Sequence, residues 1–296
     1  MNQIIVNAPA TLPGRQRPDQ PAMRGLFMDP RHYGHRRKWV SHRMSNIVNS
    51  PIFVLVITLI AQSIAAFAGD LFRRSRGSLN ESERKDFDTV QAAALTLLAL
   101  VIGFSFSMAV TRYDQRKNYE EAEANAIGTE YVRADLLPAK DAEDARQLLK
   151  QYLDQRVLFY LTRDERQINQ INSDTAKLQA ALWSIVARPA NTQPTPIIAL
   201  AVAGMNDVLN SQGYTQAAWW NRIPVAAWAM MVLIAVFCNF LVGYGERKRG
   251  APLLFVLPVI ISIPLLLIAD IDSPRGGIIR VLPQNLISAS QSMKAQ

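Results

Sequence analysis

VIGFSFSMAVTRYD, residues 101–114, begins as apolar as a membrane helix and ends charged, with no glycine or proline at the change. Downstream, RYDQRKNYEEAEANA continues without a helix breaker until Pro138, apart from an isolated Gly128. Upstream, residues 80–83 (Asn-Glu-Ser-Glu) have the spacing of a capping box, which predicts a helix start near Glu81. One helix from there to Leu137 would be about 85 Å long at 1.5 Å per residue. The stretch therefore predicts a single helix that leaves the bilayer and continues into water.

Four windows of the 296-residue chain contain no Asp, Glu, Lys or Arg: 51–69, 89–110, 223–244 and 251–269. Each is about as long as the 17–25 residues that cross a bilayer as a helix. Four buried helices of a soluble protein are the alternative, but they would need unusually long charge-free runs. The single cysteine, Cys238, lies inside the third window, so no disulfide framework is expected. The fold class predicted is an all-α membrane protein with four transmembrane helices.

The spans fall into two hairpins separated by a polar region of helical periodicity. This organisation gives five segments: a basic tail expected to be disordered (1–49), a first transmembrane hairpin (50–110), a helical soluble domain (111–222), a second hairpin (223–270) and a C-terminal tail (271–296). The three histidines all lie in the basic tail, where solvated side chains are a simpler interpretation than a metal site.

Within the soluble domain, apolar residues at helical spacing predict a helix over 141–163. Ser173 or Asp174 is expected to cap another helix that runs through Ala187. RPANTQPTP (188–196) is interpreted as a proline-rich loop, and Thr195-Pro196 as the N-cap and first residue of a helix to Asn210.

Orientation depends on the positive-inside rule, and the basic residues compete. Arginines and lysines of the two short loops favour a cytoplasmic loop side, whereas residues 31–43 and the exit Arg112, Arg116, Lys117 favour a cytoplasmic helical domain. Exporting the basic tail without a signal peptide is awkward. We therefore expect a multi-pass membrane protein with the helical domain and both termini in the cytoplasm.

Two stripes run along the second span at helical spacing. Thr96, Leu100 and Phe104 form one, and the small residues Ala99, Gly103 and Ser107 form the other, of the kind that lets helices approach closely in lipid. Ordinary packing on every face is one interpretation. In the other, neighbouring subunits seal through the small stripe while Leu100 and Phe104 line a hydrophobic constriction that gates by dewetting.

Signatures of catalysis are sparse. The chain has no G-x-S-x-G, H-E-x-x-H, P-loop or paired C-x-x-C motif, so neither an enzyme nor a cofactor is predicted. Asp270 and Asp272 could bind a divalent ion, but a polar helix end followed by a turn at Ser273-Pro274 is the simpler interpretation. Gly243-Tyr-Gly245 is interpreted as a helix stop. The spans carry no ionisable residue that a proton-coupled carrier would need, which favours a passive route or no route at all.

Two stretches resemble bestrophin channels: VIGFSFSMAVTRY (101–113), with its Gly-Phe followed by Val-Thr-Arg-aromatic, and WNRIPVAAW (220–228) with FLVGY (240–244). More closely, residues 50–290 resemble the bacterial bestrophin-like family of membrane proteins. The stretches that carry this resemblance are LNESERKDFDTVQAAALTLLALVIGFSFSMAVTRYDQRKNYEEAEANAIGTEY, GMNDVLNSQGYTQAAWWNRIPVAAW and IADIDSPRGG.

The resemblance to bestrophins implies a homopentameric ion channel, often anion-selective, with a narrow apolar neck on the second helix. The neck positions fall on Phe104, Leu100 and Thr96, the last two departing from the bulky apolar type. The acidic calcium clasp of animal bestrophins is not reproduced by Asp270 and Asp272, so calcium activation is not carried over.

The leading hypothesis is therefore an oligomeric channel in the lipid bilayer, with other copies of the chain and a permeant ion, not nucleic acid, as partners. A non-conducting membrane scaffold, whose helical domain binds a soluble partner, is the alternative. A membrane enzyme that uses Asp270 and Asp272 comes third.

Overall fold

A computed structural model describes residues 50–76, 80–245 and 253–295, and every regular element in these ranges is a helix. The tail predicted over 1–49 and most of the second short loop lie outside the described residues. Four of the helices are long and apolar enough to cross a membrane, as the sequence predicts.

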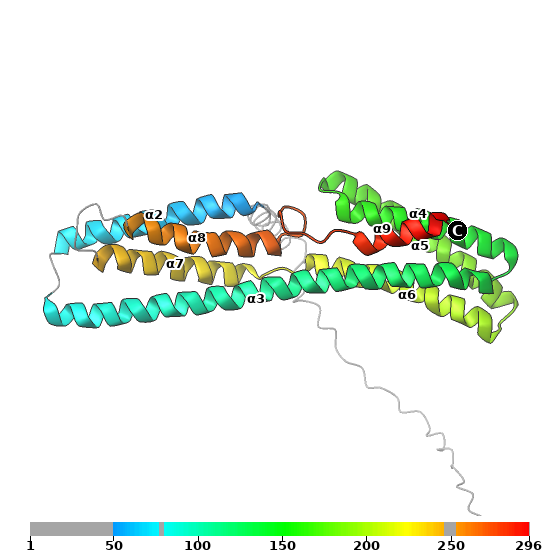
Figure 1. Ribbon diagram of the computed structural model, residues 1–296, viewed down its shortest axis with the longest axis horizontal. Coiled ribbons are helices and arrows are strands. Elements are labelled where there is room, and N and C mark those ends of the chain that lie inside the picture. The colour runs from blue at the N-terminus through cyan, green and yellow to red at the C-terminus, as the bar shows by residue number, and fades with distance from the viewer. Residues whose placement is uncertain (1–49, 77–79, 246–252, 296) are drawn as a thin grey trace, which may run out of the picture. The chain divides into compact units, whose positions relative to one another are not determined.

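Helix α3 runs unbroken from Glu81 to Arg133, over 53 residues. Its start is fixed by the predicted capping box, in which Glu83 N–H donates to Asn80 Oδ1 and Asn80 N–H donates to the Glu83 carboxylate. A short 3₁₀ turn, Ala134–Leu136, follows, and Leu137 is extended because Pro138 disfavours helical geometry in the residue before it. At 1.5 Å per residue α3 is about 80 Å long, and it lies beside both groups of helices (Figure 1).

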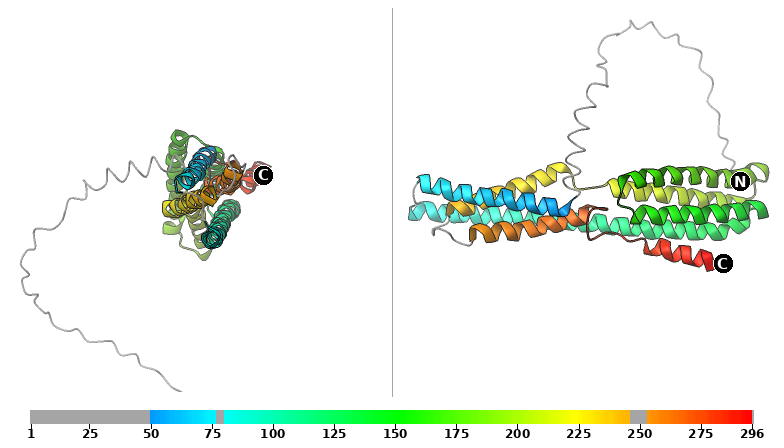
Figure 2. Two further views of the ribbon diagram at one scale, coloured as in Figure 1. Left: turned by 90° about the vertical axis from the view of Figure 1, so that its left-hand side faces the viewer. Right: turned by 90° about the horizontal axis from the view of Figure 1, so that it is seen from above.

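The other membrane helices are α2 (Pro51–Arg76), α7 (Val225–Gly245) and α8 (Leu253–Asp272). Helices α2 and α3 are consecutive along the chain, yet each packs against α7 and α8. Viewed end-on, the four helices form one bundle (Figure 2). Helix α7 includes Gly243 and Gly245, and the residues that follow lie outside the described ranges, so the predicted helix stop stays a prediction.

Close approach of α2 and α7 explains Gly69 and Gly243. A Cβ atom added to Gly69 would lie 2.1 Å from the carbonyl oxygen of Phe240, and one added to Gly243 would lie 1.9 Å from that of Ala66. Both contacts are with backbone, so neither position has room for a side chain. Glycine here brings two helix backbones together, as small residues do in lipid.

The soluble half consists of α4 (Ala139–Leu161), α5 (Glu165–Thr192), α6 (Pro196–Trp220) and the extension of α3. The predicted start of α5 is wrong: Asp164 caps this helix by accepting from Arg166 N–H. The predicted loop is also too long, because α5 continues through Pro189 to Thr192. Thr195 caps α6 as predicted, accepting from Ile198 N–H at 3.2 Å, but α6 continues past Asn210 because no breaker precedes Pro224.

The C-terminal segment, to which the sequence assigns no element, contains α9 (Gln284–Ala295), packed on α3 and α4. The buried carboxylate of Glu120 on α3 accepts from Leu286 N–H at 3.0 Å and from Asn285 Nδ2 at 2.7 Å. A residue of a distant helix therefore satisfies the first turn of α9, which local sequence does not cap.

Two apolar cores result, one in the membrane bundle and one among the soluble helices. Tyr113, at the end of the opening stretch, packs against both. The site described next therefore lies on a helix that belongs to the two cores at once.

Candidate functional site

The membrane half of α3 is covered by its own chain on one side only. Leu98 and Ala109 are buried in the membrane core, and Ser105 between them is buried too. Leu100 is 54% exposed and Phe104 63% exposed, and Thr96 is exposed beside them. The three predicted neck residues therefore share a face of α3 that points away from the rest of the protomer.

This face presents carbon to its surroundings. Thr96 Oγ1 donates to the carbonyl of Ala92 at 2.9 Å, so its hydroxyl is satisfied within the helix. Thr111, further along, bonds Ser107 in the same way. Leu97, seven residues before Phe104 and therefore on the same helical face, is half exposed. The resemblance to bestrophins does not point to Leu97, whose spacing places it on the face of the predicted neck residues.

Ala99 and Gly103 of the small stripe line an apolar groove of about 560 Å³ between α3 and α8, together with Phe106. Its opposite wall is formed by residues of α8 that include Ile260, Pro264 and Leu267. A Cβ atom on Gly103 would meet nothing within 4 Å. No described residue of the protomer therefore requires a small residue there. Ser107 is exposed but does not line the groove.

Asp270 and Asp272 are engaged by backbone amides. Asp272 accepts from Ile223 N–H at 3.1 and 3.2 Å, which ties the end of α8 to the start of α7. Asp270 accepts from the N–H groups of Ile278 at 2.8 Å and Ile279 at 2.7 Å. The turn predicted at Ser273-Pro274 is present. Within the described ranges no three His, Cys, Asp or Glu side chains gather around a possible metal position.

A neutral polar cluster inside the membrane bundle was missed by sequence reasoning, which considered only ionisable groups. Asn239 Nδ2 donates to Gln62 Oε1 at 2.9 Å, and Gln62 Nε2 donates to Ser262 Oγ at 3.1 Å. All three side chains are buried. Gln62 and Asn239 are the only amide side chains in their charge-free windows. Their presence in the sequence could therefore have indicated a polar cluster. The cluster joins α2, α7 and α8 by hydrogen bonds.

Charged residues also enter the soluble core. Arg156 of α4 donates from Nε to Glu123 of α3, and Thr215 of α6 donates to the same carboxylate at 3.0 Å. Both charged side chains are fully buried. The guanidinium of Arg156 lies 4.4 Å from the ring centre of Phe159, with Arg275 at 4.6 Å. Three helices therefore meet at one compensated ion pair.

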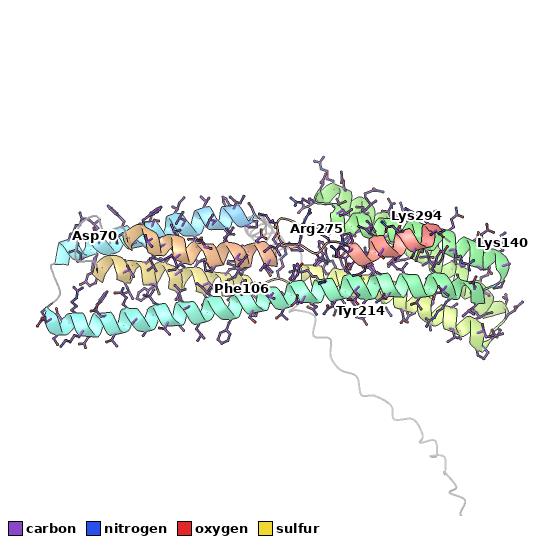
Figure 3. The ribbon with its side chains drawn as sticks, in the orientation of Figure 1. Asp70, Phe106, Lys140, Tyr214, Arg275 and Lys294 are labelled. Carbon is purple, nitrogen blue, oxygen red and sulfur yellow. The ribbon has the colours of Figure 1, made fainter. Side chains whose placement is uncertain are left out.

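Arg275 lies in the segment between α8 and α9 (Figure 3) and joins that segment to α4. Its Nη1 donates to the carbonyl oxygens of Phe159 and Thr162, both at 2.8 Å. Its guanidinium also lies 4.3 Å from the ring centre of Trp219.

Burial raises the pKa of the Tyr160 phenol, and the Glu123 carboxylate adds to the effect. That hydroxyl therefore stays protonated at any ordinary pH.

Glu130 differs from the other buried acids of α3. Neither carboxyl oxygen has a hydrogen-bond partner among the described residues. Burial raises its pKa to about 8, against the opposing effect of the nearby Arg133. A Cβ atom on Gly204 of α6 would lie 2.0 Å from Glu130 Oε2, so the carboxyl occupies the space beside this glycine. This group is therefore largely neutral at physiological pH.

Comparison with known proteins adds a family and a fold. The model of the Bestrophin-like domain matches residues 52–286. No curated protein sequence matches the chain significantly. A bacterial bestrophin homolog from Klebsiella pneumoniae shares 15% identity, with a TM-score of 0.55 over 82% of this chain and 95% of that one. A point variant of that homolog gives 14% identity and a TM-score of 0.58 over 83% and 99% of the two chains.

At these identities the solved structures establish the fold alone, whereas the family model covers most of the chain, from the first span to the start of α9. The chain belongs to the Bestrophin-like family.

Proposed function

We propose that the protein is an oligomeric ion channel whose narrow neck is formed by α3 helices from several copies. Family and fold make such a channel the natural expectation. The observation that carries the proposal is the exposed apolar face of α3 at Leu100 and Phe104, which the protomer itself leaves uncovered. Arranged around an axis, this face gives a hydrophobic constriction.

Assembly would use the groove beside that face. The small stripe at Ala99 and Gly103 offers room for side chains from a helix of the next copy, and the apolar lining of the groove would exclude water from the contact. A five-fold arrangement follows the bestrophin precedent. The ion would then pass down the axis without exchanging charge with a side chain, because the spans hold no ionisable group at mid-membrane.

We propose that the soluble helices and both termini face the cytoplasm of a bacterial inner membrane. Arg112, Arg116 and Lys117 support this orientation, because they lie where α3 leaves its charge-free window on the helical-domain side. Lysines and arginines close to the ends of the spans face the cytoplasm more often than the opposite side.

Planar-bilayer recording of the purified oligomer tests the channel, with Phe104→Ala as the informative variant. Removing the ring widens the constriction and weakens dewetting, so we expect a several-fold higher conductance or open probability than in wild type. Phe67→Ala is the matched control. Phe67 is 65% exposed on α2, close to the 63% of Phe104, and its loss should leave the current unchanged.

A verified oligomer that passes no current in any salt would exclude the channel. A protein that is found as a monomer or dimer and captures a soluble partner through residues 111–222 would instead support the scaffold hypothesis. Equal effects of Phe104→Ala and Phe67→Ala would show that the current is real but that the neck lies elsewhere.

A further inference from the structure

Three arginines meet where the membrane bundle joins the soluble helices. Arg112 and Arg116 lie on α3 just beyond its charge-free window, and Arg222 immediately precedes Ile223 at the entry to α7. All three lie close enough to Asp272 to interact with it electrostatically. Arg112 and Arg222 are also close enough to Arg116 to repel it. Three cations therefore act electrostatically on one carboxylate.

That carboxylate is only partly available to the arginines, since both of its oxygens accept from Ile223 N–H. Arg116 instead donates to backbone carbonyl oxygens, those of Ile271 at 3.1 Å and Asp272 at 3.5 Å. Neither Arg112 nor Arg116 forms an ion pair with another described residue. The two charges of Arg112 and Arg116 therefore exceed the single charge of Asp272, and a buried excess of charge is costly unless it is compensated.

Hydrogen-bond donors are also left over. Arg116 is only 2% exposed, and its Nε is buried without an acceptor in the described part of the chain. Arg112 Nη1 is likewise buried without an acceptor there. Guanidinium donors in a planar fork match the oxygens of a phosphate group. Both the charge and the unused donors therefore call for one oxyanion.

The position determines which anions can arrive. Asp272 ends α8 and Ile223 lies just before α7, so the cluster lies at the surface of the bilayer, at the depth of lipid phosphates. Arg116 is buried, whereas Arg112 and Arg222 are only partly buried. Arginines at a membrane surface attract anionic headgroups.

We propose that Arg112, Arg116 and Arg222 form a binding site for one phosphate-type anion, supplied by an anionic phospholipid headgroup or by free phosphate. The site lies on the covered side of α3, opposite the exposed neck face, so this proposal does not depend on ion conduction. Binding would compensate the arginines and join α3, α7 and α8 at the membrane boundary.

Thermal unfolding of the full chain, purified in detergent and stripped of lipid, tests the site. Three additions are compared: phosphatidylglycerol, phosphatidylcholine and inorganic phosphate. We expect phosphatidylglycerol to raise the melting temperature by several degrees and phosphatidylcholine to have little effect. An equal rise with inorganic phosphate identifies a free anion as sufficient, whereas a rise with phosphatidylglycerol alone identifies the lipid. Native mass spectrometry counts the molecules retained per subunit.

Arg112→Gln and Arg222→Gln should each lose most of the anion-dependent rise and the retained lipid. Arg112→Gln should also melt no lower than wild type without anion, because it removes repulsion within the cluster. Lys140→Gln is the control: it removes the same charge from an exposed position at the distant end of the soluble helices (Figure 3). No anion-dependent rise in wild type, or the same rise in Arg112→Gln as in Lys140→Gln, would overturn the proposal.

Discussion

Glu130 shows how one side chain can make the soluble half of the molecule sensitive to pH. Its pKa is raised from 4.5 to about 8 by burial, so the folded state holds a proton that the unfolded chain releases above pH 4.5. Because the pKa of this acid is higher in the folded state, Glu130 does not lower the free energy of unfolding below pH 4.5, where it is protonated in both states. Stability falls as pH rises from there to about 8, by at most about 1.4 kcal/mol per pH unit.

Glu130→Gln should remove this dependence, because the amide stays neutral at every pH. We expect the melting temperature of wild type to fall between about pH 5 and pH 8, and that of Glu130→Gln to change much less over the same range. Glu121→Gln, at an exposed acid of the same helix, should keep the wild-type profile. Parallel profiles for all three proteins would show that Glu130 is already ionised in the folded state.

At the scale of elements, the crossing of α2 and α7 depends on backbone contact. Gly69 and Gly243 each lie against a carbonyl of the opposite helix, and the amides of Gln62 and Asn239 bond across the same pair. Packing and hydrogen bonding thus coincide along one interface. In lipid, where burial of apolar surface gives little drive between helices, both contribute to association.

Gly243→Ala should destabilise this crossing by roughly 1–3 kcal/mol, since the new methyl group must displace the Ala66 backbone. Gly213→Ala on α6 is the control, because a Cβ atom there meets nothing within 4 Å. Higher helix propensity should leave it neutral or stabilise it by up to about 1 kcal/mol. Chemical denaturation in detergent compares the two, and equal stability of both variants would contradict the tight crossing.

For the whole molecule, α3 is the element that the proposed neck and the soluble core share. Its membrane half exposes Leu100 and Phe104, and its other half buries Arg116, Glu120, Glu123 and Glu130 on one face. Because α3 is continuous, a displacement of the soluble helices along its axis would also move the residues of the proposed neck. The number of subunits decides between the channel and the scaffold hypotheses, because a neck lined by α3 needs several copies of the chain.

Gly103→Leu should reduce the assembly to smaller species while leaving each protomer folded. The leucine would fill the groove proposed for another copy, yet no described residue of the protomer lies within 4 Å of a Cβ atom there. Gly213→Leu, at an exposed site on α6, should keep the wild-type mass. Native mass measurement with circular dichroism separates loss of assembly from loss of fold. A Gly103→Leu oligomer of unchanged mass would place the subunit contact elsewhere.

Much of the architecture follows from local sequence. The charge-free windows specify four spans, and the capping box with the absence of a breaker specifies α3 to within a few residues, because span length and helix caps depend on residues close in the chain. The predicted start of α5 is wrong because it also rests on local sequence. Ser173 and Asp174 are residues that often cap helices, but here they lie inside the longer helix. The neck and seam residues stay predictions that wait for the oligomer.

Neighbours distant in the chain decided the rest. The sequence by itself determined the spans, the continuous α3 and the structural turn after Asp270. Only the tertiary structure decided that Glu120 caps α9, that Gly243 serves a helix crossing and that Arg116 is buried without a carboxylate to itself. The physical reason is that burial, hydrogen-bond partners and steric room depend on which residues pack together. Those neighbours are distant in the chain, so the local sequence does not specify them.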